Sequence, residues 1–425
     1  MLKKNFNFSY TSFFKSNILI PKNILELKSY LKNKHTIIGN QRSYGDSFIG
    51  KKTHISLKNF NKISKIDYKK KIVEVESGTL LLHLNEKTLC KNLILNCAPG
   101  CKYVSVGGMI ANNISGKLLQ KNSLKNFIHS IKIINNKLKL VECSKYKNQK
   151  LFDLTIGGKG KTGPIISAKL KLEKINSDKF FRKSFHFSNY YDFFKHFKKL
   201  NSYKYAVCWI DFTKKNFSGI IFAGSNFKKK NIILNKYNDI KLPNLVISFL
   251  SLFVTRKVFT IFFNSIFKLK NLLFKDQVLN LNDFFFPQNK ILNWNDLFKK
   301  KGFIQFHIFI DRKNMIKIID SLKSNFDKEK IFSNFAIIKF HNDKIKNYQN
   351  MSLSLDIPVH DNYDKIKKIL NYHIKKFDID VNLSKDIILN NLNKKTLNSN
   401  PIFNAKMKKF FMKSYISNLF DRLDS

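Results

Sequence analysis

The chain has 425 residues, 43% of them hydrophobic, which is enough for two domains and a sizeable core. Its formal net charge is +49, from 78 Lys and Arg against 29 Asp and Glu. Nucleic-acid binding would explain such a charge, but the lysines are spread along the whole chain, and no helix-turn-helix, zinc-finger or RNA-binding signature occurs. We therefore expect a solvated basic surface without a nucleic-acid partner. Such a surface favours anionic lipid headgroups and phosphate-bearing substrates.

Cysteine usage indicates a reducing compartment. The five cysteines follow no disulfide or metal-binding spacing: Cys90, Cys97, Cys101, Cys143 and Cys208. The basic first residues lack the apolar run and cleavage site of a signal peptide. We expect a cytoplasmic protein without a metal site.

The predicted elements of the first 175 residues alternate between short strands and helices. Hydrophobic periodicity predicts a helix over 25–31, a strand over 36–38, a strand over 72–76, a helix over 80–90, a hairpin of strands 131–134 and 138–141, and a strand over 166–173.

Three glycine-rich loops, at 39–46, 98–108 and 157–163, lie among these elements. Glycine lets backbone N–H groups approach a ligand closely and form anion-binding nests, so three such loops suggest a large phosphate-bearing cofactor. The third loop literally matches a dinucleotide fingerprint and hints at a P-loop. Both motifs require a helix next, whereas Pro164 and an alternating strand follow here. We therefore reject the Rossmann and P-loop interpretations.

The rest of the chain predicts a second domain. Strands are expected over 205–211, 219–224, 303–310, 334–340 and 351–357, with helices over 313–325 and 364–376. This order suggests an antiparallel sheet with helices on one face.

The segment 246–267 is strongly apolar but is interrupted by Arg256 and Lys257. Central charges argue against a membrane-spanning helix. An in-plane interfacial segment or a mobile substrate lid fits the pattern, and a buried core helix is the alternative. The interfacial interpretation, together with the basic surface, implies peripheral contact with an anionic membrane surface, at the inner face of the cytoplasmic membrane.

The order and the residue sequences of the glycine loops resemble those of the vanillyl-alcohol-oxidase type of FAD-binding domain (PCMH type). Within that superfamily they are most similar to the decaprenylphosphoryl-β-D-ribose 2-oxidase family and the aldonolactone oxidases. The resemblance implies an α+β fold, with a two-subdomain FAD-binding domain over 1–175 and a substrate domain over 176–381. It also implies a C-terminal segment, 382–425, that returns to the FAD domain with a terminal helix over 409–424.

The resemblance implies which residues hold the cofactor. They are Ile38, Gly39, Asn40, Gln41, Arg42, Ser43, Tyr44, Gly45, Asp46, Ser47, Gly100, Ser105, Val106, Gly107, Gly108, Asn112, Asn113, Ser115, Ile165 and Asn382. Some relatives attach the flavin through a His in the first loop, and the family usually has His at the position of Ser115. This chain has no His in either loop, so we expect non-covalent FAD. A second departure is the segment 122–125, where the family has a Gly-Ser-Phe-Gly run.

The resemblance also assigns the substrate pocket. Substrate-binding residues would be Lys117, Gln305, His307, Lys339, Ser352 and Ser354, and catalytic residues would be Lys385 and Tyr44. Lys385 matches a family lysine held against the flavin and the reacting hydroxyl. A fixed cation there stabilises the negative charge that hydride transfer places on the flavin.

The resemblance implies an FAD-dependent oxidoreductase that oxidises a secondary alcohol of a sugar. The favoured substrate is a polyprenyl-phosphate-linked pentose of cell-envelope polysaccharide biosynthesis, with a short-chain-dehydrogenase-type reductase completing the epimerisation. One alternative is an aldonolactone oxidase. The alternative of another class is a basic membrane-surface or nucleic-acid-binding protein with a decayed flavin site.

Overall fold

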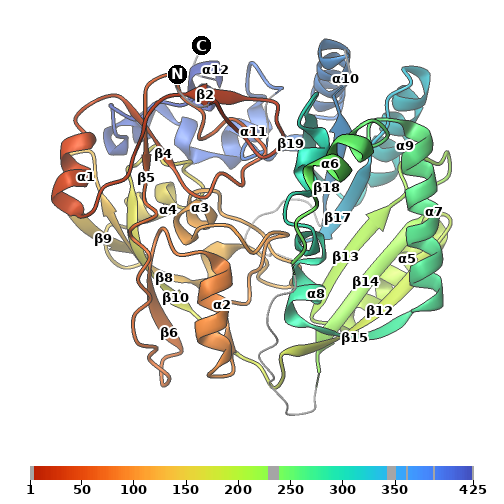
Figure 1. Cartoon of the computed structure of the whole chain (residues 1–425), viewed down its shortest axis with the longest axis horizontal. Coiled ribbons are helices and arrows are strands. Elements are labelled where there is room, and N and C mark those ends of the chain that lie inside the picture. Colours follow the sequence, from red (N-terminus) through yellow and green to blue (C-terminus); the bar gives the residue numbers. More distant parts are fainter. Residues whose placement is uncertain (1–3, 228–238, 342–350, 360–361, 386–387, 424–425) are drawn as a thin grey trace.

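The computed structural model describes residues 4–227, 239–341, 351–359, 362–385 and 388–423. The chain forms two halves that lie side by side (Figure 1). Residues up to about 175 and the C-terminal segment form one half, and the residues between them form the other.

Small sheets build the first half. Its strands are β1 (Lys4–Phe6), β2 (Phe13–Lys15), β3 (Ile18–Leu19), β4 (His35–Ile38), β5 (Thr53–Ser56), β6 (Ile72–Glu76), β7 (Leu93–Ile94), β8 (Ile128–Ile134), β9 (Leu140–Ser144), β10 (Ile165–Lys171) and β11 (Glu173–Lys174). Its helices are α1 (Ile24–Tyr30), α2 (Leu81–Leu89), α3 (Val106–Ala111), the 3-10 helix η1 (Leu124–Phe127) and α4 (Gln149–Thr155). β3, β5 and β4 form a parallel sheet, and β6, β10, β8 and β9 form an antiparallel one.

The strands and helices predicted in this half are confirmed, with bounds that agree within three residues. Strand β6 covers the predicted range and alternates between buried and half-buried side chains. The predicted hairpin pairs Ile134 with Leu140 around the turn at Asn135. Asn23 caps α1 by accepting a hydrogen bond from the amide of Glu26.

One antiparallel sheet of eight strands dominates the second half. Its strands are β12 (Lys179–Phe187), β13 (Tyr205–Ile210), β14 (Gly219–Asn226), β15 (Asp276–Asn280), β16 (Phe303–Ile310), β17 (Phe335–Phe340), β18 (Met351–Pro358) and β19 (Asp380–Val381). Their order is β15-β12-β14-β13-β17-β18-β16-β19. The predicted antiparallel sheet is therefore confirmed, and β12, β15 and β19 extend it.

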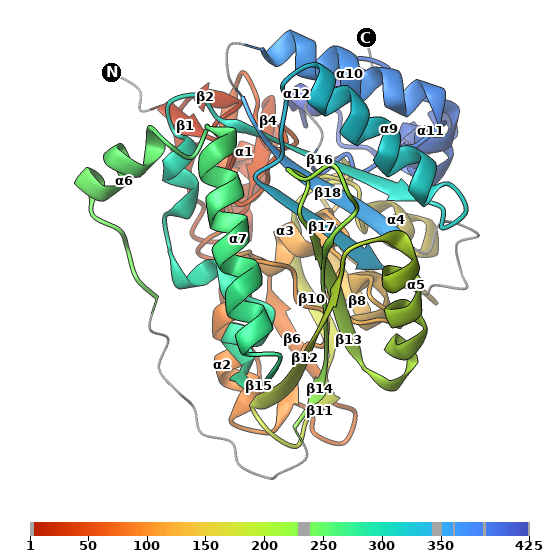
Figure 2. The same cartoon turned by 90° about the vertical axis from the view of Figure 1, so that its right-hand side faces the viewer.

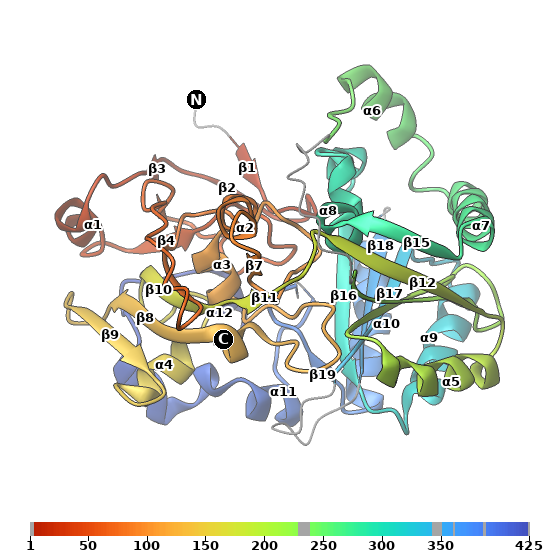
Figure 3. The same cartoon turned by 90° about the horizontal axis from the view of Figure 1, so that it is seen from below.

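Helices cover both faces of this sheet. The helices of this half are α5 (Tyr190–Lys198), η2 (Lys199–Ser202), α6 (Asn244–Ser251), α7 (Lys257–Leu273), α8 (Leu281–Phe285), η3 (Pro287–Lys290), η4 (Trp294–Phe298), α9 (Met315–Lys328) and α10 (Tyr363–Lys376). α5, α9 and α10 pack on one face and enclose an apolar core. α7 lies on the opposite face, where Phe267 contacts Trp209, so the expected one-sided cover is incomplete (Figures 2 and 3).

The apolar segment 246–267 is divided between α6 and α7, with a break around Arg256. Most of its large apolar side chains are exposed, which is inconsistent with a buried core helix. Within the described residues, no helix is long and apolar enough to cross a membrane.

The C-terminal segment begins in the core of the second half, with Ile388 and Leu389, and then packs against the first half. It contains α11 (Lys394–Ser399), η5 (Pro401–Phe403), η6 (Ala405–Phe410) and α12 (Asn418–Leu423). Tyr415 forms a parallel bridge with His35, and the guanidinium of Arg422 pairs with Asp46 at 3.2 Å. The terminal helix predicted over 409–424 is therefore wrong for its first part, because the residues around Tyr415 bond to the start of β4 in an extended conformation.

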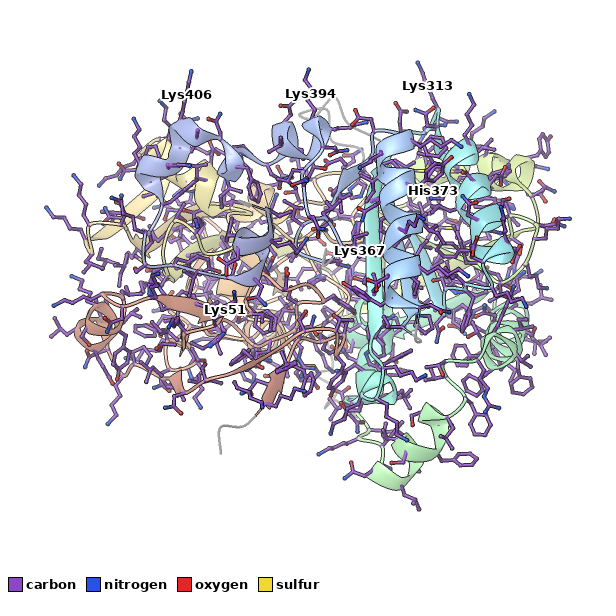
Figure 4. The ribbon with its side chains drawn as sticks, turned by 90° about the horizontal axis from the view of Figure 1, so that it is seen from above. Lys51, Lys313, Lys367, His373, Lys394 and Lys406 are labelled. Carbon is purple, nitrogen blue, oxygen red and sulfur yellow. The ribbon has the colours of Figure 1, made fainter. Side chains whose placement is uncertain are left out.

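Lysine side chains project from both halves of the molecule (Figure 4). They include Lys51, Lys394 and Lys406 in the first half and C-terminal segment, and Lys313 and Lys367 beside the large sheet. The structure thus gathers these lysines into no single stripe.

The third glycine loop generates a stability prediction. Gly163 has a φ of +120°, and an added Cβ would overlap the carbonyl oxygen of Ile134. Gly163→Ala should lower the free energy of unfolding by about 3 kcal/mol, because both backbone strain and this overlap must be relieved. Gly100→Ala is the matched control, since a Cβ there meets its nearest atom at 3.9 Å. Equal thermal melting points for both variants would contradict the prediction.

Candidate functional site

A large cavity of about 2070 Å³ lies between the two halves. Its walls come from the three glycine loops, from one face of the eight-stranded sheet, from α6 and α7, and from the segment around Lys385. Pockets for drug-sized ligands usually measure about 300–1,000 Å³, so this cavity has room for a dinucleotide and a substrate together.

The first glycine loop leaves β4 and presents free backbone amides. In the described structure, the N–H groups of residues 40–45 donate to no protein acceptor. Gln41 has a φ of +51°, which turns the chain as an anion-binding nest requires. Asn7 and Ser9 hold the loop by donating to the carbonyl oxygen of Tyr44, at 2.7 and 2.9 Å. Ser43 also donates to the carbonyl oxygen of Ser384 (2.8 Å), which joins the loop to the C-terminal segment.

The second glycine loop packs directly on the first. Ser105 caps α3 by accepting a hydrogen bond from Gly108, and its Oγ occupies the space that a Cβ at Gly39 would need. A Cβ at Gly107 would lie 2.8 Å from the Cβ of Ser77. Glycine is required at both places because the loops approach so closely.

The stretch after α3 turns into the cavity at Asn113, which has a φ of +41°. The Oδ1 of Asn113 accepts hydrogen bonds from the Ser123 hydroxyl (2.9 Å) and the Lys125 amide (3.2 Å). Asn112 donates to the carbonyl oxygen of Gly108 at 2.9 Å. Residues 122–125, where the resemblance implies a Gly-Ser-Phe-Gly run, therefore hold this wall through hydrogen bonds to the side chain of Asn113.

Asn122 also joins the two halves. Its side chain is buried and donates to the carbonyl oxygen of Phe340 (3.0 Å) and to the ring of His341 (2.6 Å). His341 in turn bonds to the hydroxyl of Ser352 at 2.8 Å. This departure from the family pattern thus has a structural role in aligning the sheet with the FAD-binding half.

The cavity face of the sheet carries the predicted substrate residues in register. Gln305 pairs with Asp356 across β16 and β18, and His307 pairs with Ser354. Lys339 pairs with Ser352 across β17 and β18. Because side chains alternate along a strand, these polar groups share one face. They all line the cavity.

A buried carboxylate organises the polar cluster. Gln305 donates to Asp356 at 2.6 Å, and burial raises the pKa of Asp356. Burial also raises the pKa of Tyr44 well above its ordinary value, with a further contribution from Asp356. The ammonium of Lys385 lies 5.2 Å from the centre of the Tyr44 ring.

Cations crowd the same cavity. Burial lowers the pKa of Lys385 and repulsion from Lys339 lowers it further, while the attraction of Asp356 opposes both effects. Burial, followed by repulsion from Lys339 and Arg182, lowers the pKa of Lys117 to about 7. Lys117 donates to the carbonyl oxygen of Phe284 (2.8 Å) and Lys339 to that of Ser115 (3.0 Å), and both acceptors are neutral.

His307 is a neutral imidazole in this setting. Burial lowers its pKa well below the ordinary value, and Lys385 and Lys339 add repulsion. Neither ring nitrogen has a hydrogen-bond partner in the described structure. A buried imidazole with two free nitrogens is costly unless a ligand completes its hydrogen bonds.

The structure brings nearly all predicted site residues to one cavity. The exceptions are Gly45, Asp46 and Val106, which do not line it. Asp46 pairs with Arg422, and Val106 is buried in the core of the first half.

Three important cavity residues were missed by the sequence interpretation: Asp356, Arg182 and Trp209. Asp356 lies two residues beyond Ser354 on the same strand, so the alternation that selected Ser352 and Ser354 could have found it. Arg182 and Trp209 had no comparable signal, because only the pairing of β12, β14 and β13 turns them toward the cavity.

The residues present fit an FAD. The free amides of 40–45 can receive its phosphates, and the close-packed glycines leave room for its chain. Unpartnered buried polar atoms of Asn112, Gln305 and Ser384 line the same space. Among the described residues, no group of three His, Cys, Asp or Glu side chains could hold a metal ion.

Comparison with known proteins identifies the domain. Residues 18–144 match the FAD binding domain family. This range contains the first two glycine loops, and FAD is therefore the cofactor of this chain.

The curated relatives include oxidases and dehydrogenases. The chain is 23% identical to the decaprenylphosphoryl-beta-D-ribose oxidase of Mycolicibacterium smegmatis over 291 residues, which are 64% of this chain and 62% of that protein. It is 25% identical to the L-gulonolactone oxidase of Scyliorhinus torazame over 150 residues, 35% of this chain and 34% of that protein. Cytokinin dehydrogenase 1 of Arabidopsis thaliana is 29% identical over 106 residues, 25% of this chain and 18% of that protein. The chain thus spans less than two thirds of the length of each of these relatives.

The contact between the first two glycine loops predicts a double-mutant result. Gly39→Ala should lower the FAD content of the purified protein, because the new Cβ overlaps the Ser105 hydroxyl oxygen and separates the loops. Adding Ser105→Ala should restore much of the FAD content. Without the hydroxyl oxygen, the nearest atom to the Cβ added at Gly39 is the Ser105 Cβ, at 3.7 Å. Flavin released by acid precipitation measures the content and also tests the expected non-covalent attachment.

Ser105→Ala alone is the control, and it should lose less FAD than Gly39→Ala. Additive losses in the double variant, or flavin that stays with the protein pellet, would count against this account of the loop contact.

The two loops with their free amides, the polar sheet face opposite them and the family match converge on one conclusion. The protein carries a PCMH-type FAD-binding domain, and its sequence is similar to those of a decaprenylphosphoryl-beta-D-ribose oxidase and an L-gulonolactone oxidase.

Proposed function

We propose that this enzyme oxidises a secondary alcohol of a sugar carried on a polyprenyl phosphate, with the C2 hydroxyl of a pentose as the favoured site. The observation that carries the proposal is the order in which polar, cationic and apolar side chains lie across the cavity wall. The similarity to an enzyme named for decaprenylphosphoryl-β-D-ribose supports it.

The polarity of the side chains on the cavity wall changes from one strand to the next. The polar cluster lies on β16 and β18, with Gln305, His307 and Asp356. Lys339 follows on β17, Trp209 on β13, Phe222 on β14 and Arg182 on β12. Five strand spacings of about 4.8 Å separate β16 from β12, roughly 24 Å in all.

This order matches the parts of a lipid-linked sugar. The polar cluster suits a sugar with several hydroxyls, and the cations suit a phosphate. The apolar part combines Trp209, Phe222 and Phe267, whose rings lie 5.0 to 6.1 Å apart. The guanidinium of Arg182 lies 4.9 Å from the Phe222 ring, so a cation borders the apolar end. A small, water-soluble lactone would leave this end unused.

The proposed chemistry is oxidation of an alcohol to a ketone. The carbon–hydrogen bond breaks and its electron pair leaves with the hydrogen as hydride, which FAD accepts when bound. The hydroxyl proton leaves to a base, and the carbon–oxygen bond becomes double. Neutral His307, with both ring nitrogens unpartnered in the described residues, suits the proton acceptor. Lys385 supplies the positive charge that stabilises the developing negative charge.

Two other functions are alternatives to this proposal, and the proposed reaction needs a partner enzyme. An aldonolactone oxidase is the second candidate, favoured by the similarity to L-gulonolactone oxidase. A partner reductase of the short-chain-dehydrogenase type would return the keto sugar to the opposite configuration. We expect this activity in the cytoplasm at the inner face of the membrane. A basic binding protein with a decayed flavin site fits poorly, because it would not need the buried polar cluster.

The two enzyme candidates predict different reductants. Under anaerobic conditions, a polyprenyl-phosphate-linked ribose should bleach the bound flavin much faster than an aldono-1,4-lactone. A lipid-linked pentose with a shorter chain should reduce it with a higher KM, because less of the apolar wall is covered. Fast reduction by the lactone, without reduction by the lipid-linked sugar, would establish the aldonolactone alternative.

Removing the Lys385 side chain should slow flavin reduction while leaving FAD binding intact. Lys385→Ala should still fold and bind FAD, but substrate-driven bleaching of the flavin should slow by roughly a hundredfold or more. Lys385→Arg should not rescue the rate, because the planar guanidinium differs in shape from a compact ammonium.

Lys376→Ala, on α10 and away from the cavity, is the control and should leave the rate unchanged. Rapid bleaching by Lys385→Ala would show that the charge-stabilising role belongs to another residue of the cluster.

A further inference from the structure

The helices α6 and α7 form a protruding edge of the second half (Figures 2 and 3). Their inner sides line the cavity through Leu250, Val254, Phe263 and Phe267. Their outer sides carry a set of large apolar side chains that face away from the protein. These residues, which we call the outer apolar face, are Leu245, Phe249, Leu252, Val258, Phe262, Ile266, Leu269 and Leu273.

The helix α7 is amphipathic in the reverse sense of a usual surface helix. Its buried side chains are polar: Thr260, Asn264 and Asn271. Asn264 donates to Asp211 at 2.8 Å, and Asn271 accepts from Arg182 at 3.0 Å. A surface helix of a water-soluble protein normally turns its apolar stripe inward and its polar side outward. Asn264 and Asn271 on the polar side bond to residues of the sheet, and the apolar side is left for another partner.

The spacing of the exposed residues gives one continuous stripe on α7. Residues 258, 262, 266, 269 and 273 recur at intervals of four or three, so they share one helical face. Val258 is 78% exposed, Phe262 62% and Leu273 70%. On α6, Leu245 and Phe249 repeat the pattern at 83% and 61% exposure. An exposed apolar surface of this kind marks an interaction site.

The charges on this part of the chain are all of one sign. Residues 240–275 contain six Lys and Arg and no Asp or Glu. Among the cations, Lys257 begins α7, and Lys268 and Lys270 lie near its end. Apolar residues bordered by cations are typical of helices that lie in the interface of an anionic membrane.

The same charges disfavour other occupants. A second copy of this chain would bring another +49 of net charge to the contact, and like charges oppose association. A nucleic acid would pair with the cations but would leave the phenyl and leucyl side chains against water. An anionic bilayer satisfies both groups at once, because the side chains enter the acyl boundary while the cations meet phosphate headgroups.

We propose that the outer apolar face of α6 and α7 docks the protein on an anionic lipid bilayer. Docking through these helices brings the apolar wall of the cavity to the membrane surface. A lipid-linked substrate could then pass from the bilayer to the cavity without crossing water. The docking itself does not depend on which sugar is oxidised.

Vesicle binding of the FAD-loaded protein tests the proposal without measuring catalysis. The protein should sediment with phosphatidylcholine vesicles that contain phosphatidylglycerol, and weakly with pure phosphatidylcholine. Added salt should reduce the binding, because it screens the headgroup attraction. The double variant is Phe262→Glu/Leu269→Glu, whose positions do not line the cavity. Its affinity for the anionic vesicles should fall by roughly tenfold or more.

The matched control is Leu25→Glu/Tyr146→Glu, at positions 79% and 95% exposed in the first half, and it should bind like the parent. A second measurement uses an environment-sensitive dye at Phe262→Cys, whose emission should shift to the blue with anionic vesicles, while a dye at Leu25→Cys should not shift. Equal vesicle binding by both double variants would overturn the proposal. So would concentration-dependent dimerisation of the parent that Phe262→Glu/Leu269→Glu abolishes, without vesicle binding.

Discussion

The burial of positive charge against one cavity is the constraint on which the rest of the structure depends. Lys117, Lys339, Lys385 and Arg182 all line the cavity, with Asp356 as the carboxylate that faces Lys385. Isolated cations away from water are costly, and this burial lowers the pKa values of Lys117 and Lys339. A neutral backbone carbonyl group accepts a hydrogen bond from each of the two. An anionic cofactor or substrate would offset the remaining cost, so these buried cations favour phosphate-bearing ligands.

This constraint explains why the two halves are tied together by side chains rather than by a large apolar contact alone. Asn122 reaches across to His341, and Lys339 reaches back to Ser115. Both bonds fix the distance between the glycine loops and the sheet, which is the width of the cavity. A polar cluster can only act on a substrate if this width is held, because catalytic contacts weaken steeply with small displacements.

The helix α7 also contributes to the cavity wall and holds one of its cations. Its polar side anchors Arg182 through Asn271, and its Phe267 covers Trp209. One helix thereby holds a cation at the cavity wall, closes the apolar end of that wall and leaves its apolar stripe on the outside. The buried asparagines of α7 bond to Asp211 and Arg182 on this face of the sheet, while α5, α9 and α10 cover the other face.

Local patterns in the sequence were sufficient for much of the fold and for the cofactor. Alternation predicted β6, β16 and β18, because the side-chain period of a strand is expressed within a few residues. The resemblance of the glycine loops, with the family match over residues 18–144, was sufficient for FAD. The strand that follows the third loop excluded the competing nucleotide motifs without any structure.

Tertiary structure decided what no local pattern contains. Asp356 becomes the partner of Gln305, and Arg182 and Trp209 reach the cavity, only through the register between strands far apart in the chain. The apolar segment 246–267 could be core, lid or surface by composition, and its exposure was settled by which side of α7 meets the sheet. The predicted terminal helix gave way around Tyr415 to an extended bridge with His35. Periodicity reports which side chains share a face, but only the completed packing determines what that face meets.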